Sequence, residues 1–349
     1  MGKYPDITQA LSYNALINCF VGNRGGGKTY MTMKHCIDSF IKSKFTDQWV
    51  YVRRTDKVIR DKFNRKKGDL FADMAPLYPE FELSCDGNAM LLDDGYTTHV
   101  MGYGTALSMG DDFKSSPYPG VRNIFLEEFI ITNTRTHQYL PREIELFYDL
   151  YETVARPGSE HKRVQVFMCA NAVTITNPYF DEWRLEMPEP GKIRRFGPDG
   201  NVIVWNVVMP DFVVAKKESE FGRLIDGSRY ADYAIENKWL LDTSTFLGKK
   251  PQWSRLRLNL VYDGVYYGVW EDTKNWLYYC STDHNRDCPD TYPVTTDDHM
   301  PNTMLAKVAR KLPCLKLFME SYECGAVRFE SVRVKNKFRD IMRILRGRD

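Results

Sequence analysis

Apolar residues along the chain form short runs separated by stretches with helical spacing. The runs ALINCFV (15–21), WVYV (49–52), VRNIFL (121–126) and VQVFMCA (164–170) have the length and composition of buried strands. After residue 29, and again over 142–156, apolar residues recur every three or four positions, which predicts amphipathic helices. Buried strands that alternate with helices predict an α/β domain with a central, mostly parallel sheet.

Between these strands the pattern predicts further elements. Residues 63–78, first basic and then apolar, are expected to form a helix, and 81–104 a β-meander with turns at DGN and DDG. The Pro- and Gly-rich segment 187–200 indicates either a surface hairpin or a domain edge. A polar stretch, 215–238, has the composition of a helix.

The pattern changes to all-β from residue 255 onward. The segments RLRLNLVYDG, VYYGVWED and WLYYCSTDH predict three strands joined by tight turns, and two helices are expected at 301–322 and 335–346. A chain of 349 residues is long enough for two domains. We therefore expect a first domain at 1–206, a linker at 207–249 and a C-terminal domain at 250–349.

Charge is distributed unevenly along the chain. The formal net charge is only +2, but residues 306–349 carry 12 Lys and Arg against 5 acids. Such a basic tail is typical of a segment that contacts a polyanion, and equally of a solvated helix face.

The cysteines indicate neither a zinc site nor a disulfide framework. None of the eight forms a C-x-x-C pair, and Cys19 and Cys169 lie in apolar runs as expected of buried thiols. Cys280 and Cys288 could pair, but the first residues contain no apolar signal segment. No run of about 18 apolar residues is present either. These features predict a soluble protein in a reducing cytoplasm.

The stretch GNRGGGKTY carries the clearest chemistry. Gly22, Gly27, Lys28 and Thr29 fit G-x-x-x-x-G-K-[ST] at every fixed position, and the stretch follows an apolar strand and opens a helix. Glycines let successive backbone N–H groups point at an anion, and the helix N-terminus faces the same place. Lys28 is expected to reach the β- and γ-phosphates, and Thr29 to bind Mg²⁺. The motif alone leaves a kinase, a GTPase and a motor ATPase open.

Two adjacent acids, Glu127 and Glu128, follow the buried strand VRNIFL. A phosphate loop needs an acid at the tip of a neighbouring strand to hold Mg²⁺ through water. A second acid can polarise the attacking water. We assign Glu127 to the metal and Glu128 to the water, although Asp is the usual residue at the first position.

Two further polar residues come at the ends of elements. Asn171 ends the strand VQVFMCA, where an amide could sense the γ-phosphate, orient the water or simply form a turn. Arg156 ends the preceding helix. It is either a surface arginine or a group that reaches the site of a neighbouring subunit.

Together these motifs resemble the DNA-packaging (encapsidation) ATPases of small short-tailed phages of the Salasvirus type. The resemblance runs nearly end to end, and FGRLIDG and NPYF are specific to it because they lie outside any generic nucleotide motif. The segments that carry it are LSYNALINCFVGNRGGGKTY, WVYVRR, SSPYPGVRNIFLEEFI, LYETVAR, CANAVTITNPYF, FGRLIDGSRY and VYDGVYYGVW.

The resemblance implies an ATP- and Mg²⁺-dependent motor that threads double-stranded DNA into an empty capsid. It implies a P-loop fold of the additional-strand (RecA-like) class, a pentameric ring and docking on the portal vertex in the host cytoplasm. Arg156 would act in trans as an arginine finger. From the place of Arg24 inside the loop, we also hypothesise that it reports the nucleotide state to a neighbouring subunit. The residues expected to bind the nucleotide are Gly22, Arg24, Gly25, Gly26, Gly27, Lys28, Thr29, Tyr30 and Asn171.

For the C-terminal domain the resemblance implies an RNase H-type nuclease that has lost its catalytic acids. The strand LRLNLVYDG has no acid in its middle, and Asp263 is expected in a hairpin turn. Glu271, Asp272 and Asp283 fall at strand ends, where solvated acids are ordinary. A binding module for DNA, the portal or a structural RNA is therefore favoured over an active nuclease.

DNA itself would be held through its phosphates. Candidates are four basic residues at strand ends or in loops: Arg53, Arg54, Lys57 and Lys114. Arg53 or Arg54 could equally reach a nucleotide phosphate.

Two other functions remain open: a terminase-like packaging protein that still cuts DNA, and a small P-loop kinase. The adjacent pair Glu127 and Glu128 and the strand after it argue against the kinase, because a kinase needs no water-activating glutamate. A GTPase would need an N-K-x-D motif, and the sequence has none.

Overall fold

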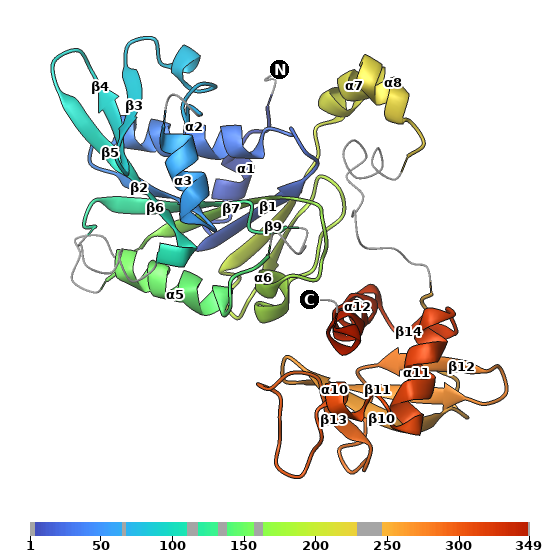
Figure 1. Cartoon of the computed structure of the whole chain (residues 1–349). Coiled ribbons are helices and arrows are strands. Elements are labelled where there is room, and N and C mark those ends of the chain that lie inside the picture. Colours follow the sequence, from blue (N-terminus) through green and yellow to red (C-terminus); the bar gives the residue numbers. More distant parts are fainter. Residues whose placement is uncertain are drawn as a thin grey trace. The chain divides into compact units, whose positions relative to one another are not determined.

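The computed structural model describes residues 4–64, 68–109, 118–131, 138–156, 163–228 and 246–347. The chain divides into two compact units, Met1–Leu241 and Asp242–Asp349 (Figure 1). The first unit continues past residue 206, because its last central strand ends at Val207 and two helices follow, α7 (Pro210–Glu218) and α8 (Glu220–Ile225). No helix among the described residues is long and apolar enough to cross a membrane.

A nine-stranded sheet forms the centre of the first unit, in the order β3-β4-β5-β2-β6-β7-β1-β9-β8. The six strands from β5 to β9 in this order run parallel, and β3, β4 and β8 add antiparallel edges. The strands are β1 (Ile17–Gly22), β2 (Gln48–Arg53), β3 (Glu82–Asp86), β4 (Ala89–Asp93), β5 (Thr98–Ala106), β6 (Val121–Glu127), β7 (Gln165–Asn171), β8 (Ile193–Phe196) and β9 (Val202–Val207).

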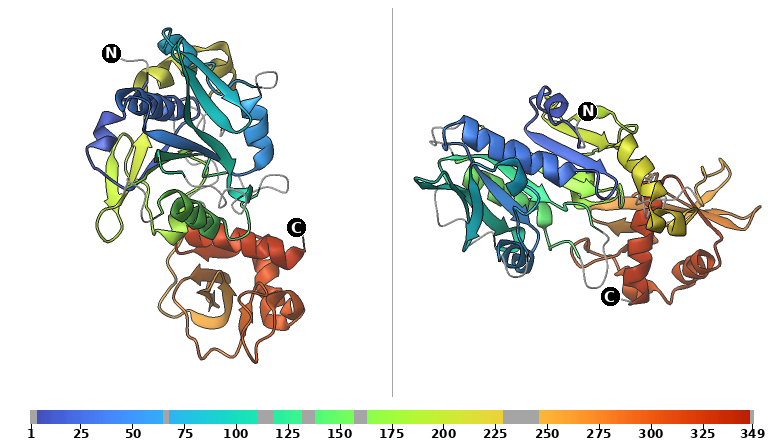
Figure 2. Two further views of the ribbon diagram at one scale, coloured as in Figure 1. Left: turned by 90° about the vertical axis from the view of Figure 1, so that its left-hand side faces the viewer. Right: turned by 90° about the horizontal axis from the view of Figure 1, so that it is seen from above.

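Helices cover both faces of this sheet (Figures 1 and 2). Trp49 and Tyr51 of β2 pack in the core with α2 (Lys28–Lys42) and α3 (Asp56–Phe63). Val50 and Val52 pack in the opposite core with α5 (Glu143–Val154) and α6 (Pro178–Glu182). Alternate residues of a strand point to opposite faces, so a strand with helices on both sides is apolar throughout. The unit also contains α1 (Thr8–Leu11), η1 (Ala75–Leu77) and η2 (Leu107–Met109).

Most elements predicted from the sequence are confirmed. The four apolar runs are β1, β2, β6 and β7, segment 81–104 is the β3-β4-β5 meander, and 187–200 contains β8 of an antiparallel hairpin. The helix expected at 63–78 is wrong: Phe63 ends α3, and the described residues after it form turns and η1. Most large apolar and aromatic side chains of this segment are nonetheless buried, although Leu77 is exposed, so its composition reflected burial and not a helix.

Parallel register brings the carboxyl ends of the central strands to one edge of the sheet. Gly22 of β1 pairs with Asn171 of β7 on one side and with Val207 of β9 on the other. Glu127 of β6 pairs with Cys169. Ligands of open α/β sheets bind at this edge, and the phosphate loop and both acids lie there.

The second unit contains a five-stranded sheet in the order β13-β10-β11-β12-β14. The predicted meander is present as three antiparallel strands, while two short parallel strands at the edges were not predicted. The expected helix 301–322 is divided in two. The elements are β10 (Arg255–Tyr262), β11 (Val265–Asp272), β12 (Leu277–Ser281), β13 (Thr291–Pro293), β14 (Val327–Phe329), α10 (Ala306–Ala309), α11 (Pro313–Glu323) and α12 (Val332–Arg346).

The eight cysteines differ in burial, and each is a free thiol. Cys19 and Cys169 are buried as predicted, and all eight cysteines are free, so Cys280 and Cys288 do not pair. Burial raises the pKa of the Cys169 thiol to about 12, which makes it an unreactive part of the core.

Candidate active site

The loop between β1 and α2 needs its glycines for two different reasons. Gly25 and Gly27 adopt left-handed backbone angles, with φ of 83° and 73°. A Cβ atom on Gly22 would lie 2.3 Å from the carbonyl oxygen of Val207, and one on Gly26 would also meet its own loop. The loop is therefore compact, and a side chain fits poorly at any of these four positions.

Lys28, the first residue of α2, is almost fully buried under this loop. Its Nζ donates to the carbonyl oxygen of Asn23 at 2.7 Å and to Oδ1 of Asn171 at 3.3 Å. Burial lowers the pKa of Lys28 to about 8, although Cys169 and Glu127 act in the opposite direction. The ammonium group is thus held at the loop, with the Asn171 amide beside it.

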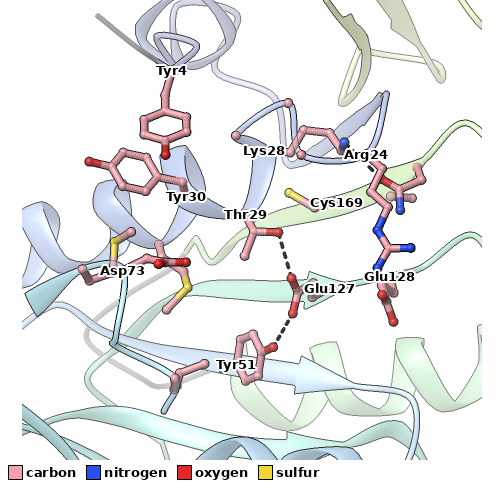
Figure 3. A pocket seen from close by; sticks show the side chains of 18 of the residues that line it. Tyr4, Arg24, Lys28, Thr29, Tyr30, Tyr51, Asp73, Glu127, Glu128 and Cys169 are labelled. Carbon is pink, nitrogen blue, oxygen red and sulfur yellow. Dashed lines mark hydrogen bonds between the residues drawn. The ribbon is translucent and has the colours of Figure 1, made fainter. Parts of the chain in front are cut away.

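Thr29 and Glu127 meet across the sheet edge (Figure 3). The Thr29 hydroxyl donates to Oε1 of Glu127 at 2.8 Å, and the Tyr51 hydroxyl donates to Oε2. Arg53 Nη1 lies 2.5 Å from the same Oε2 atom. Burial alone would raise the pKa of Glu127, but Arg53, Tyr51 and Thr29 stabilise the carboxylate and hold its pKa below the ordinary range. Glu127 is therefore ionised and aimed at Thr29.

Glu128 differs from its neighbour in exposure and in backbone conformation. Its side chain is 48% exposed and pairs with Nη2 of Arg53. Its φ of 59° is unusual for a residue with a side chain, and its N–H donates to the carbonyl oxygen of Cys169 at 2.8 Å. Both carboxylates therefore meet at the guanidinium of Arg53, but Glu127 is buried whereas Glu128 is half-exposed.

These groups line a cavity of about 380 Å³. Several of its residues were predicted: the loop from Arg24 to Tyr30, both acids and Asn171. Others were not: Tyr4, Met33, Tyr51, Lys62, Asp69, Leu70, Asp73, Met74, Cys169 and Ala170. The Tyr4 ring stacks on Tyr30 with centroids 4.0 Å apart. Tyr4 precedes the motif by about 20 residues, so only the folded chain brings it to the loop.

Helix α7 also rests on the phosphate loop. A Cβ atom on Gly25 would lie 2.8 Å from the Phe212 ring, and Lys216 Nζ donates to the carbonyl oxygen of Arg24 at 3.2 Å. The segment after the last central strand therefore contacts the nucleotide loop directly.

The basic residues predicted to contact DNA lie in different places. Lys57 is exposed, whereas Lys114 falls outside the described residues. Arg53 is buried and paired with the two acids. Arg54 is buried too, and its guanidinium is 2.7 Å from both carboxylate oxygens of Glu143, so the predicted DNA contact of Arg54 is wrong for this conformation.

Arg156 is exposed and lies just past the end of α5, outside the cavity lining. Because α5 connects two adjacent parallel strands, β6 and β7, it runs back across the sheet. Its last residues are therefore at the edge opposite the site. An effect of Arg156 on catalysis would need a second subunit.

Two acids of the second unit, Asp263 and Asp272, lie at turns. Among the described residues, no group of three or more His, Cys, Asp or Glu is placed to hold a metal. Asp263 lies in the predicted turn, with φ of 52°. Asp272 was expected to be a solvated acid at a strand end, and this prediction is wrong. Its side chain is fully buried and accepts hydrogen bonds from Trp253 Nε1 at 3.0 Å and Asn275 Nδ2 at 2.7 Å. Asp272 therefore closes a turn.

A glycine loop with a buried lysine, a threonine against one carboxylate and a second carboxylate beside it is an arrangement suited to hydrolysing a nucleoside triphosphate. A family model described as Podovirus DNA encapsidation protein (Gp16) matches residues 3–346. The chain belongs to this family. The resemblance inferred from its motifs is confirmed.

Individual relatives agree with the family assignment. The chain is 30% identical over 336 residues to the DNA packaging protein of Bacillus phage phi29, covering 96% of each chain. It is similar to a chain of the bacteriophage phi29 viral genome packaging motor assembly, with a TM-score of 0.76, 28% identity and coverage of 99% and 100%. The N-terminal domain of the phi29 DNA packaging ATPase matches 60% of this chain and 100% of its own, at 29% identity and a TM-score of 0.51.

Proposed function

We propose that this protein hydrolyses ATP and uses the energy to move double-stranded viral DNA into a preformed capsid. The observation that carries the hydrolysis is the 2.8 Å contact between Thr29 and Glu127 beside a compact glycine loop, with Glu128 next in the chain. The movement of DNA is supported by the family and by the relatives named as packaging proteins.

The chemistry follows from the positions of these groups. Lys28 binds phosphate oxygens in place of its present partners, and the loop N–H groups surround the β-phosphate. Glu128 accepts a proton from a water molecule, whose oxygen attacks the γ-phosphorus as the bond to the departing ADP oxygen breaks. Asn171, 3.3 Å from Lys28 Nζ, is placed to sense the phosphate or orient the water.

Mg²⁺ fits the polar groups opposite the loop. The Thr29 hydroxyl and the Glu127 carboxylate would hold it together with phosphate oxygens, Glu127 acting through water. When bound, the ion neutralises charge on the phosphates. Glu127 is one methylene longer than the usual Asp, and its carboxylate is held in place by Tyr51 and Arg53.

Hydrolysis is coordinated between subunits of a ring, which we expect to be a pentamer on the portal vertex of the capsid in the infected cell. Arg156 is the proposed arginine finger, acting on the site of a neighbouring subunit. Its exposure and its place outside its own cavity suit this role.

The second unit is proposed to be a binding module that descends from an RNase H-type nuclease. Its basic tail would grip the portal, the DNA or a structural RNA. In the first unit, Lys57 and Lys114 remain candidates for contacts with DNA phosphates, as does Arg53 if it leaves the acids.

The test is ATP turnover by the full chain with and without duplex DNA. We expect DNA to stimulate turnover and Glu128→Gln to lower it by at least about a thousandfold, with ADP affinity unchanged. Glu80→Gln, at an exposed acid that does not line the cavity, is the matched control. Full activity of Glu128→Gln would refute the catalytic assignment. Transfer of phosphate to a small molecule would favour a kinase, and Mg²⁺-dependent cutting of the DNA an active nuclease.

A further inference from the structure

The backbone of Glu128 is held by a side chain from another strand. Arg54, which follows β2, donates from Nη1 to the carbonyl oxygen of Glu128 and from Nη2 to that of Phe129, both at 3.1 Å. Two donors of one rigid, planar guanidinium thus fix two successive peptide groups. These peptide groups directly follow the left-handed φ of Glu128, which needs such support.

Arg54 is itself fixed by a buried carboxylate. Its Nε and Nη2 atoms each lie 2.7 Å from one oxygen of Glu143, the first residue of α5. Both side chains are buried, and the Leu140 N–H also donates to Glu143 at 2.9 Å. A buried ion pair gains little stability over an apolar pair of similar volume. The Arg54–Glu143 pair therefore matters for the orientation it gives the Arg54 guanidinium and not for the stability it adds.

A third residue completes the arrangement and explains the motif NPYF. Tyr179 is fully buried, and its hydroxyl donates to Oε1 of Glu143 at 2.9 Å. Asn177 caps α6 by accepting from the Phe180 N–H at 3.1 Å, which positions this helix. The Tyr179 ring also meets the Phe129 ring edge-on, with centroids 5.5 Å apart. The motif therefore packs against the residue that follows Glu128.

A second aromatic residue ties the same loop to Arg54. The Tyr139 ring lies 4.9 Å from the Arg54 guanidinium, and its hydroxyl accepts from the Ile131 N–H at 3.0 Å. The segment from Glu128 to Ile131 is thus held at both ends by groups that converge on Arg54.

We propose that Arg54, Glu143 and Tyr179 form a clamp that sets the position of the Glu128 carboxylate for catalysis. This inference rests on the proposed role of Glu128. The three residues do not touch the nucleotide cavity, so they are positioning residues. The clamp acts on the backbone of Glu128, whereas Arg53 contacts its side chain, so the two arginines have separate effects.

The clamp is tested in the full chain with Arg54→Lys and Tyr179→Phe. Lysine keeps the charge, but its compact ammonium group lacks the planar fork with which Arg54 makes four hydrogen bonds to two carbonyls and both oxygens of Glu143. We expect Arg54→Lys to lower kcat for DNA-stimulated ATP hydrolysis about a hundredfold, since a shift of about 1 Å has an effect of that size. KM and the affinity for ADP should change less than about twofold, because the phosphate loop is untouched. Tyr179→Phe, which deletes one oxygen atom, should lower kcat about threefold to tenfold. KM and the affinity for ADP should again change less than about twofold.

The matched control is Tyr148→Phe on α5. The Tyr148 hydroxyl donates to Glu182 at 3.2 Å and accepts from Trp183 at 2.8 Å, so this variant removes an oxygen between the same two helices without reaching Glu143. We expect its kcat to match the wild type. All assays are run well below the unfolding midpoint of each variant.

Two outcomes would overturn the clamp. One is a kcat of Tyr179→Phe equal to that of Tyr148→Phe. The other is a parallel loss of kcat and ADP affinity in Arg54→Lys, which would indicate a general loss of structure. If Arg54→Lys does not fold, Tyr179→Phe alone decides. Retained activity of Glu128→Gln is a different result, because it refutes the proposed catalytic role before the clamp is considered.

Discussion

Arg53 Nη1 lies 2.5 Å from Oε2 of Glu127, and both side chains are about nine-tenths buried. Arg53 also pairs with Glu128, so one cation balances both acids of the site. This relationship joins the carboxyl ends of β2 and β6 and determines how the site responds to mutation.

Replacing Arg53 by Met should destabilise the first unit by about 3 kcal/mol at pH 7. The variant leaves Glu127 ionised and buried without its cation, which costs more than the intact pair contributes. Unfolding in urea measures the change. In the double variant Arg53→Met/Glu127→Gln the buried charge is gone, and most of the loss should be recovered. A loss below about 1 kcal/mol in the single variant would contradict the buried pair.

Nucleotide affinity should fall as the pH rises through about 8. Lys28 has a pKa of about 8 in the free protein, because burial disfavours its charge. Below this pH the ammonium is present before the nucleotide binds, whereas above it each binding event must take up a proton. The association constant for ADP should therefore decrease above pH 8, and the decrease should approach about tenfold for each further pH unit.

Calorimetry in buffers of different ionisation enthalpy measures this proton uptake. Lys34→Ala, on the same helix but more exposed, is the control and should show the wild-type profile. An association constant that stays flat from pH 7 to pH 9 would mean that Lys28 keeps its charge.

Replacing Thr29 by Ala should separate binding from hydrolysis. The variant removes the hydroxyl that contacts Glu127 and that is expected to bind Mg²⁺. We expect kcat with Mg²⁺ to fall more than about tenfold, and affinity for ADP without Mg²⁺ to change less than about threefold. Thr29→Ser keeps the hydroxyl and should behave nearly as the wild type. Equal losses in both measurements would show that Thr29 serves only to hold the loop.

Gly22→Ala should destabilise the first unit by about 2–3 kcal/mol through overpacking. The new methyl group would lie 2.3 Å from the backbone carbonyl oxygen of Val207, which cannot move without shifting β9. Calorimetric unfolding measures the loss. Gly248→Ala, where the nearest atom would be 3.4 Å away, is the control for adding a methyl group. Similar midpoints for both variants would refute the close approach.

Mixing Arg156→Ala subunits with wild-type subunits should inhibit DNA-stimulated turnover more than in proportion to the mutant fraction. If Arg156 completes the site of the next subunit, each mutant subunit disables a wild-type neighbour. Turnover across a series of mixing ratios measures the effect. The control is Arg142→Ala, because Arg142 is also exposed but directly precedes the first residue of α5. A linear decline for Arg156→Ala would exclude action in trans.

The sequence predicted the phosphate loop and most of the sheet because both depend on local patterns. The residues from Gly22 to Thr29 are adjacent in the chain, so their spacing alone specifies a turn of backbone N–H groups. Strands buried on both faces are apolar at nearly every position, so β1, β2, β6 and β7 could be predicted from their apolar runs. The prediction of a helix over 63–78 was wrong because side chains buried in irregular structure have the same apolar composition as the buried face of a helix.

Only the tertiary structure decided what surrounds Glu127 and Glu128. The order of strands placed β2 beside β6, which brought Arg53 and Tyr51 to Glu127. In the sequence Arg53 and Arg54 looked equivalent, as two cations at the end of one strand. Successive residues of a strand point to opposite faces. Arg53 therefore faces the acids of the nucleotide site, while Arg54 turns to Glu143 of α5 and holds the backbone of Glu128 from behind.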